Sequence, residues 1–445
     1  MVMAGDPREQ WTSRYGFVLA AIGSAVGLGN MWRFSYLAAE NGGAAFVILY
    51  LLATLVVGLP VLLAELVLGR GSQKSPIQAL LHYGGRAWKP LGLVFVGAGF
   101  LILSYYAVIA GWALRYGLAA VASGFDPNAA ERFGEVASGW DAFGYHVAFM
   151  ALTVFVVVGG VSRGIERASV VLMPMLFALI VGLALYAATL DGAGAGYAYY
   201  LGADFSKLLS FDVLKDATGQ AFFSLSLGMG AMLTFASYLG RDVNLPRAAA
   251  TIAGADIAIA FIAGLVVFPM IFALDLSADV NASSVGALFI TLPKAFAEMG
   301  SVGRGVGILF FAALIVGALT SAISLLEVVV SSAIDGFGWS RRPAGILLGI
   351  AITAIGAPSA WRTDILGAID QVANNILLLG GGFALSIFVG WVMAGPIEEA
   401  SEGAAGVAWF GSWRNLLRYA VPIFLFFVLV YDAIPSTFKT IADLF

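Results

Sequence analysis

The sequence contains no cysteine, only two histidines and few charged residues. Without cysteine the chain has no disulfide, no thiol nucleophile and no cysteine-based metal site. His82 and His146 lie far apart in the sequence, and neither has a neighbour at the spacing of a metal ligand. Charged residues make up 11% of the chain, against roughly 25% in a typical soluble domain. This scarcity of charge argues against a soluble protein.

Apolar residues are abundant: 60% of the 445 residues are hydrophobic, and the mean hydropathy is +0.93. A membrane-spanning helix needs about 20 mostly apolar residues. We therefore predict an all-α integral membrane protein, with residues 1–445 forming a single domain. The polar N-terminus lacks the apolar core of a cleavable signal peptide, so we expect it to stay on the mature chain. About eleven spans are predicted, near residues 15–40, 43–69, 91–121, 143–160, 166–189, 214–239, 247–274, 305–334, 344–357, 366–394 and 415–434.

Lys and Arg are distributed unevenly over the connections between these spans. With the N-terminus on the cytoplasmic side, the inner connections hold about twice as many of them as the outer ones, as the positive-inside rule expects. An odd number of spans then leaves the C-terminus outside. The longer connections, near 122–142, 190–213 and 275–304, lie outside and are predicted to be packed caps. The net charge of −4 is too small to indicate nucleic acid or another charged partner, and nothing indicates an oligomeric state.

Two spans contain segments that are unsuited to a continuous helix. The first reads Gly-Ser-Ala-Val-Gly-Leu-Gly-Asn over 23–30, and the sixth reads Ser-Leu-Ser-Leu-Gly-Met-Gly over 224–230. Either segment alone also fits close helix packing, because Gly23 and Gly27 form a small-xxx-small pattern. Two such segments favour an inverted repeat with a ligand between its halves, about 12–189 and 214–394, followed by an extra helix at about 415–434.

Broken helices in a bilayer create a binding site of definite polarity. The N-terminus of a half-helix exposes N–H groups that suit a carboxylate, and the C-terminus exposes carbonyls that suit Na⁺ or an ammonium group. A zwitterionic amino acid fits both ends at once.

Five motifs occur in order along the chain: GSAVGLGNMWRF at 23–34, ENGG at 40–43, GIER at 164–167, QAFFSLSLGMG at 220–230 and LTS at 319–321. With these motifs the chain closely resembles the neurotransmitter:sodium symporter family, which has the LeuT-type fold, and in particular its bacterial and archaeal amino-acid carriers. The resemblance runs from Arg8 to about Tyr431. It implies a multi-pass protein of the cell membrane that couples sodium to amino-acid transport by alternating access.

The resemblance implies two sodium sites. The first takes oxygen atoms, completed by the substrate carboxylate, from Ala25, Asn30, Ser224 and Asp256. The second takes them from the carbonyls of Gly23, Val26 and Gly317 and the hydroxyls of Thr320 and Ser321. Hard oxygen ligands suit an alkali cation better than a transition metal. By itself, Thr320-Ser321 reads as a polar pair that bonds back to its own helix.

The resemblance also implies a substrate pocket and a substrate class. The pocket residues are Ala25, Gly29, Ile102, Tyr106, Phe223, Ser226, Met229, Ser321 and Leu325. Tyr106 would bind the substrate carboxylate and, with Phe223, close the pocket outward. Biogenic-amine carriers have Asp where this chain has Gly27, so the substrate is expected to bring its own carboxylate. The apolar wall of the pocket predicts a large aliphatic or aromatic side chain.

Asp256 departs from many relatives, which have Asn at this position. The position that binds chloride in some relatives is matched here by Tyr50, Gln220 and Ser224, with Ala260 in place of Ser or Glu. A carboxylate at 256 supplies the negative charge that chloride supplies elsewhere, and two adjacent buried anions repel strongly. We therefore expect chloride independence. The membrane acids Glu65 and Glu327 are predicted to accept hydrogen bonds from amides of the broken helices.

Two ion pairs are implied as gates: Arg33 with Asp370 on the outer side, and Arg8 with Asp335 on the inner side. Without the resemblance, Arg8 reads as a positive-inside residue. Partly exposed pairs are worth about 0–1 kcal/mol, which suits gates that open and close.

Three alternatives remain open at this point. A proton-coupled carrier of the same fold would titrate Asp256 or Glu65, although the Thr320-Ser321 pair argues against it. An amino-acid sensor that does not transport would keep the site, and a channel would need a continuous polar stripe that the sequence lacks. An enzyme is not expected, because the intramembrane serines have no nearby His or Lys.

Overall fold

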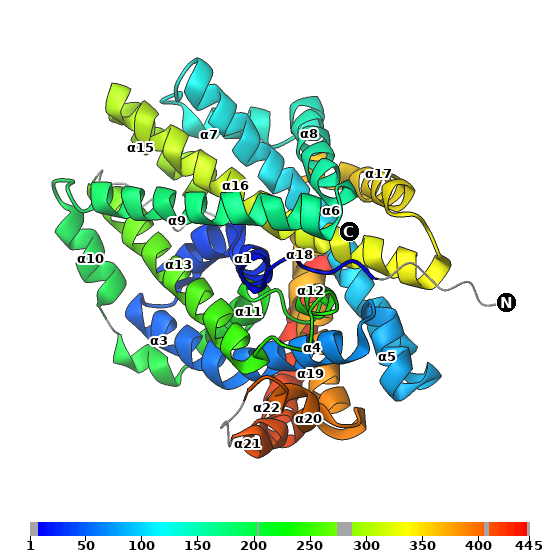
Figure 1. Ribbon diagram of the computed structural model, residues 1–445. Helices are drawn as coiled ribbons and strands as arrows, with labels where there is room; N and C mark the ends of the chain where they lie inside the picture. Colours follow the sequence, from blue (N-terminus) through cyan, green and yellow to red (C-terminus); the bar gives the residue numbers. More distant parts are fainter. Residues whose placement is uncertain (1–7, 203, 274–286, 405–408, 443–445) are drawn as a thin grey trace.

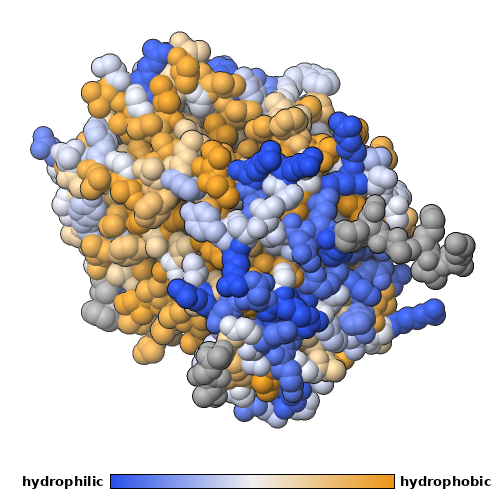
Figure 2. Space-filling view, viewed as in Figure 1, coloured by the Kyte–Doolittle hydropathy of each residue, from blue (hydrophilic) through white to orange (hydrophobic). Residues whose placement is uncertain are grey.

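The computed structural model describes residues 8–202, 204–273, 287–404 and 409–442, and over these residues the protein is all helical, with no strand. The half-helix α1 lies near the centre and packs against α9, α12, α13 and α16 (Figure 1). Apolar side chains cover much of the surface in Figure 2, whereas polar ones gather over α12 and α20. The prediction of an all-α membrane protein is confirmed.

The first half of the chain contains five spans. Their segments, with the short helices between them, are α1 (Arg14–Ala25), η1 (Gly29–Arg33), α2 (Phe34–Glu40), α3 (Ala44–Ala53), η2 (Thr54–Gly58), α4 (Leu59–Ser72), α5 (Pro76–Gly84), η3 (Arg86–Trp88), α6 (Lys89–Ala122), α7 (Ala129–Val136), α8 (Gly139–Val158), η4 (Val161–Glu166), α9 (Arg167–Ala187), α10 (Ala193–Leu201) and η5 (Phe205–Leu209).

The second half contains the remaining spans. Its segments are α11 (Phe211–Ser224), α12 (Ala231–Ala236), α13 (Leu245–Ala273), η7 (Ala287–Thr291), α15 (Leu292–Glu298), α16 (Gly300–Phe337), α17 (Arg341–Trp361), α18 (Thr363–Gln371), η8 (Val372–Leu378), α19 (Leu379–Ile387), η9 (Phe388–Val392), α20 (Pro396–Ser401), α21 (Phe410–Asn415), η10 (Leu416–Ala420), α22 (Val421–Val428), η11 (Leu429–Ala433) and α23 (Ile434–Ala442).

The number of spans agrees with the sequence. Within the described residues, nine helices are long and apolar enough to cross a membrane, or ten if the bent pair at the N-terminus counts as one span. The sixth predicted span is not among these helices, because its break divides it into α11, with 14 residues, and α12, with 6 residues, and neither is long enough to cross a membrane. The predicted outer connections contain the short helices α7, α10 and α15. Part of the third connection, 274–286, lies outside the described residues.

Both predicted helix breaks are present. In the first span, α1 ends at Ala25, Val26 is extended, and η1 begins at Gly29, with a bend of 54° between the pieces. In the sixth span, α11 ends at Ser224 and α12 begins at Ala231. Between them the chain turns through positive φ at Ser226 and Gly228. Glycine adopts this conformation without strain, whereas other residues seldom do.

A buried carboxylate holds the second break. Glu65 on α4 is fully buried, and its two carboxylate oxygens accept hydrogen bonds from the amides of Gly228, at 2.9 Å, and Leu233, at 3.2 Å. The predicted role of Glu65 as an anchor for broken-helix amides therefore agrees with its contacts. Main-chain amides inside a bilayer protein need such partners, because no water reaches them.

Gly228 provides a test of this packing. In Gly228→Ala, the added methyl group would lie 2.1 Å from the Leu378 carbonyl oxygen, at a φ of +76°. We expect destabilisation beyond the roughly 1–2 kcal/mol that left-handed backbone costs a residue with a Cβ. The measurement is thermal unfolding in detergent. The matched control is Gly254→Ala in α13, where a Cβ meets nothing within 4 Å; equal melting temperatures for the two variants would contradict the prediction.

Candidate functional site

A small cavity lies between the two helix breaks. It is lined by Ser24, Ala25, Gly27, Gly29, Ile102, Tyr106, Phe223, Ser224, Ser226, Met229, Ser321 and Leu325. This set contains all nine residues that the sequence predicts for the substrate pocket, together with Ser24, Gly27 and Ser224, which it does not. The volume is about 20 Å³, which is room for about one water molecule. A larger ligand therefore requires the side chains around the cavity to move apart.

The residues predicted for the first sodium site meet beside this cavity. Asp256 on α13 is fully buried. Its Oδ1 accepts hydrogen bonds from the Ser224 hydroxyl and from Asn30 Nδ2, each at 2.7 Å. The helix α1 ends at Ala25, which lines the same cavity. A buried carboxylate among these oxygen atoms is a strong attractor for a cation.

The Asn30 amide has a definite orientation in this cluster. Its Oδ1 accepts from the Gly27 amide at 3.0 Å, and its Nδ2 donates to Ser224 and Asp256. The nitrogen therefore faces the carboxylate. A cation between Asn30 and Asp256 would need a half turn of the amide, which would present Oδ1 in place of Nδ2.

The residues predicted for the second sodium site also converge. The Ser321 hydroxyl lies 3.3 Å from the Gly23 carbonyl, 3.4 Å from the Val26 carbonyl and 3.3 Å from the Gly317 carbonyl. The Thr320 hydroxyl lies 3.0 Å from the Gly317 carbonyl. Part of this pattern is the back-bonding expected of Ser and Thr in a helix. The contacts from Ser321 on α16 to the end of α1 are not back-bonding within one helix, because they join two different spans.

The matched chloride position is filled by internal hydrogen bonds. The Tyr50 hydroxyl donates to Asp256 Oδ2 at 2.7 Å, and the Ser224 hydroxyl donates to Oδ1. Gln220 is engaged elsewhere, since its Nε2 donates to the Gly29 carbonyl at 2.9 Å. Ala260, which is buried nearby on α13, offers no polar group. The donors that would face an anion are thus directed at the carboxylate.

The two residues predicted to form the inner gate, Arg8 and Asp335, are paired. Arg8 Nη1 donates to both carboxylate oxygens of Asp335, at 2.7 and 2.9 Å. Its Nη2 donates to the Ser237 hydroxyl at 2.8 Å, and its guanidinium lies over the Tyr238 ring. The N-terminal segment is therefore fastened to α16 and to the end of the sixth span.

A second set of hydrogen bonds holds the N-terminal segment. Glu166 accepts hydrogen bonds from the amides of Thr12 and Ser13 and from the Ser13 hydroxyl, at 2.8, 3.1 and 2.8 Å. Ser13 is also the N-cap of α1. The sequence predicts no role for Glu166, although its place in the GIER motif was an available signal.

The two residues predicted to form the outer gate, Arg33 and Asp370, are not paired. Arg33 and Asp370 both line a cavity of about 280 Å³, but no ion pair joins them in the described part of the chain. Arg33 donates to Gln220 at 3.3 Å and lies over the Phe223 ring, while Asp370 accepts from Asn374 at 2.7 Å. The structure brings the predicted outer gate residues to one cavity without pairing them.

Glu327 was predicted to accept hydrogen bonds from amides of the broken helices, and this prediction is wrong. Instead of main-chain amides, Glu327 accepts from the Tyr238 hydroxyl at 2.6 Å and from both terminal nitrogens of Arg341, at 2.7 and 3.0 Å. Tyr238 follows the end of α12 and Arg341 begins α17, so Glu327 joins α16 to the ends of two other helices and, among the described residues, binds no amide of a helix break.

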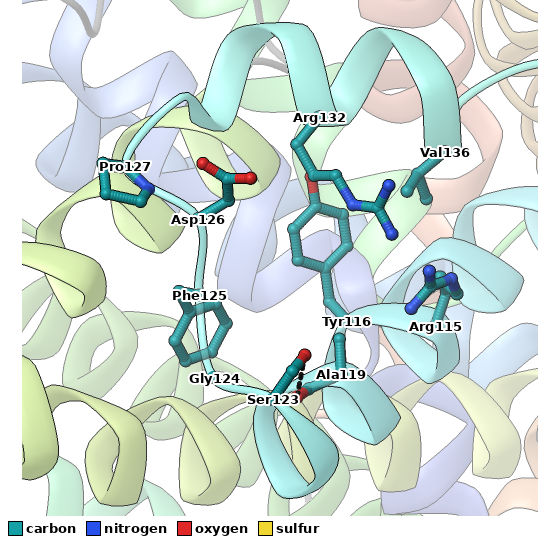
Figure 3. Close-up of a pocket in the computed structure, with 10 residues that line it drawn as sticks. All are labelled: Arg115, Tyr116, Ala119, Ser123, Gly124, Phe125, Asp126, Pro127, Arg132 and Val136. Atoms are coloured by element: carbon teal, nitrogen blue, oxygen red, sulfur yellow. Dashed lines mark hydrogen bonds between the residues drawn. The ribbon is translucent and has the colours of Figure 1, made fainter.

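A separate cavity lies near the C-terminal end of α6, next to α7 (Figure 3). It measures about 400 Å³, and Arg115, Tyr116 and Arg132 are among its lining residues. Both arginines are already paired, Arg115 with Asp141 and Arg132 with Glu135. None of the predicted site residues lines it, so it is distinct from the central pocket.

Comparison with known proteins identifies the family. The family model for the sodium:neurotransmitter symporter family matches residues 8–127 and 131–443. The chain belongs to this family. The symporter is 35% identical over 448 residues to the uncharacterized sodium-dependent transporter YhdH of Bacillus subtilis, covering 96% of this chain and 98% of that one. It is 36% identical to the uncharacterized sodium-dependent transporter MJ1319 of Methanocaldococcus jannaschii, covering 96% and 90%.

A solved structure also matches the symporter over most of its length. The crystal structure of MhsT in complex with L-phenylalanine gives a TM-score of 0.88 at 41% identity, covering 95% of this chain and 99% of that one. The symporter is therefore a sodium-dependent, multi-pass membrane transporter with the LeuT-type fold, and it is not an enzyme.

The two oxygen clusters can be tested without knowing the substrate. Sodium that binds only the folded protein raises its melting temperature. We expect the rise in NaCl over KCl to shrink in Asn30→Ala and Thr320→Ala, and the sodium concentration for half of the effect to increase about tenfold, which corresponds to about 1.4 kcal/mol. Thr251→Ala is the control, because Thr251 bonds back to Arg247 on an exposed helix face. Unchanged sodium titrations in both site variants would refute the assignments.

Proposed function

We propose that the protein is a sodium-coupled symporter of a hydrophobic or aromatic α-amino acid, that it works by alternating access, and that it needs no chloride. The observation that supports this most directly is that the pocket shares residues with each of the two oxygen clusters. Ser321 lines the cavity and contacts the carbonyls of the second cluster, and Ser224 lines the cavity and contacts Asp256. Sodium and substrate would therefore order the same side chains.

The walls of the cavity favour an apolar substrate side chain. Ile102, Met229 and Leu325 are all buried and carry no charge. A polar substrate side chain would lose its hydration there without gaining a partner. MhsT, which shares 41% of its aligned residues with this chain, was crystallised with L-phenylalanine. An amino acid with a large aliphatic or aromatic side chain is the class that fits both facts.

The polar end of the substrate would lie at the first helix break. The Tyr106 hydroxyl accepts from the Leu28 amide at 3.3 Å, and both groups are donors suited to a carboxylate. The carboxylate would complete the first sodium site, formed by Ala25, Asn30, Ser224 and Asp256. The second sodium ion would bind Gly23, Val26, Gly317, Thr320 and Ser321. Two sites are thus proposed, one of which touches the substrate.

The hydrogen bonds of Asp256 support the proposed chloride independence. Tyr50 and Ser224 already direct their hydroxyl groups at this carboxylate. A chloride ion in the same place would find few free donors and would face a fixed negative charge, which costs several kcal/mol in a poorly screened interior.

The gates define the proposed cycle. With Arg8 bound to Asp335 and Arg33 unpaired from Asp370, substrate and sodium would enter from the outside. Pairing of Arg33 with Asp370 would close the outer cavity, and release of Arg8 would open the inner side. The excess of Lys and Arg on the inner connections supports a cytoplasmic N-terminus, an outer C-terminus and a place in the cell membrane.

The domain organisation that goes with this cycle is an inverted repeat within residues 1–445. The first repeat would cover about 12–189, the second about 214–394, and about 415–434 would be an addition. Each repeat then supplies one broken helix to the site, which is the usual arrangement in carriers of this kind.

Gly27→Ala tests the place of the carboxylate. A methyl group at 27 would lie 2.8 Å from the Tyr106 hydroxyl and 2.4 Å from the Ser321 hydroxyl, and would displace both. We expect amino-acid affinity to fall at least about tenfold, or about 1.4 kcal/mol, as measured by scintillation proximity binding. Gly97→Ala, where a Cβ meets nothing within 4 Å, serves as the control. Equal affinity in the two variants would argue against carboxylate binding at Tyr106.

A binding screen tests the whole proposal. We expect purified protein to bind amino acids with large apolar side chains equally in NaCl and sodium gluconate, and not in KCl. Uptake into vesicles should follow a sodium gradient. Uptake that persists without sodium and collapses with the pH gradient would favour proton coupling. Sodium-dependent binding without accumulation would favour a sensor.

A further inference from the structure

A long apolar groove runs along the outside of the helix bundle, separate from the substrate pocket. It encloses about 1310 Å³ between α8, α9 and α17. Successive turns of the three helices line it, and none of the lining residues is Asp or Glu. Its apolar side chains are well exposed, with Phe155 at 78%, Val171 at 65% and Ile350 at 61%. In a membrane protein such a surface faces lipid.

Three arginines stand together at one end of this groove. Arg163 and Arg167 lie at the start of the fifth span, and Arg342 lies at the start of α17. All three are exposed, and within the described residues none of them forms a side-chain hydrogen bond or ion pair. The neighbouring Arg341 differs from these three, because it forms ion pairs with Glu327 and Glu9. The groove therefore ends in three guanidinium groups whose charge no carboxylate neutralises.

The length of the groove matches one lipid leaflet. Its wall on α17 runs from Arg342 to Ala354, which is about 18 Å of helix at 1.5 Å per residue. The hydrocarbon core of a bilayer is about 30 Å thick, so one leaflet contributes about 15 Å. A headgroup at the arginines would thus place an acyl chain along the whole groove.

We infer that this groove is a binding site for an anionic phospholipid, with the phosphate on Arg163, Arg167 and Arg342 and an acyl chain between α8, α9 and α17. Guanidinium groups bind phosphate through paired N–H···O bonds. Basic clusters between spans on the inner side are suited to anionic headgroups, whose negative surface potential attracts them. A zwitterionic lipid lacks the net charge that three unpaired guanidinium groups require.

A second copy of the chain fits this groove poorly. Copies in one membrane share one orientation, so a two-fold interface has its axis along the membrane normal. Such an interface would bring six guanidinium groups to the same level of the bilayer without a carboxylate in either groove. Like charges at that distance repel.

The arginines flank residues that hold the inner end closed. Glu166, which lies between Arg163 and Arg167, binds the amides of Thr12 and Ser13. Arg341, which precedes Arg342, binds Glu9, and Glu9 also accepts from the Val161 amide at 2.7 Å. A phosphate that bridges η4 and α17 would therefore brace the two elements to which the N-terminal segment is fastened.

The test is lipid binding by the full-length chain in detergent. Native mass spectrometry is run with phosphatidylglycerol or phosphatidylcholine of the same acyl chains, and thermal melting is recorded with each lipid. We expect preferential retention of phosphatidylglycerol and a larger rise in melting temperature with it. The triple variant Arg163→Gln, Arg167→Gln, Arg342→Gln should lower its apparent affinity at least about tenfold.

A matched control removes the same charge elsewhere. Arg86→Gln, Lys89→Gln, Arg247→Gln changes three other exposed cations and should keep the preference. Ala354→Trp fills the groove without changing charge and should also weaken retention. Equal retention of the two lipids by the native chain, equal losses in both triple variants, or a dimer that buries this face in place of lipid would overturn the inference. An unchanged melting temperature in phosphatidylcholine shows that each variant is folded.

Discussion

The constraint on which the rest of the structure depends is the need to satisfy main-chain groups at two helix breaks buried in apolar surroundings. Unpaired amides and carbonyls inside a bilayer cost several kcal/mol each. Glu65 takes two of the amides in the sixth span, and the Ser226 hydroxyl donates to the Ser24 carbonyl at 2.7 Å. The carbonyls of Gly23 and Val26 both face the hydroxyl of Ser321, and no other side chain among the described residues donates to them. A few oxygen atoms are thus left with spare acceptor capacity, and these are the ones available to a cation.

The same constraint ties the site to the ends of the molecule. The half-helix α1 supplies the Gly23 carbonyl to the second oxygen cluster and ends at Ala25, beside the first, and its N-cap Ser13 is held by Glu166. Any tilt of α1 that releases the Arg8–Asp335 pair would also move that carbonyl away from Ser321 on α16. In the proposed cycle, binding and opening would therefore be coupled through α1, and a ligand that favours one arrangement of α1 would shift the population of the whole protein.

Much of the fold was predictable from the sequence because bilayer thickness fixes the length of an apolar span, and glycine clusters mark the breaks. The nine pocket residues were implied by the family resemblance, and the cavity brings them together. The partners of Glu327 and the separation of Arg33 from Asp370 were not predictable, since both depend on how far long side chains reach after the spans have packed. The clasp from Glu166 to the start of α1 joins residues about 150 positions apart, a pairing that hydropathy and spacing do not encode. The small volume of the cavity likewise results from packing alone.

That small volume has a consequence for the energy balance of the membrane. A cavity of about 20 Å³ holds about one water molecule. Within the part of the chain that the structure describes, this cavity is therefore too small for a row of water molecules. A continuous row of water molecules would let protons cross the membrane and dissipate the electrochemical gradient when no substrate is bound. The tight packing of the half-helices around this cavity thus leaves no room in it for such a path.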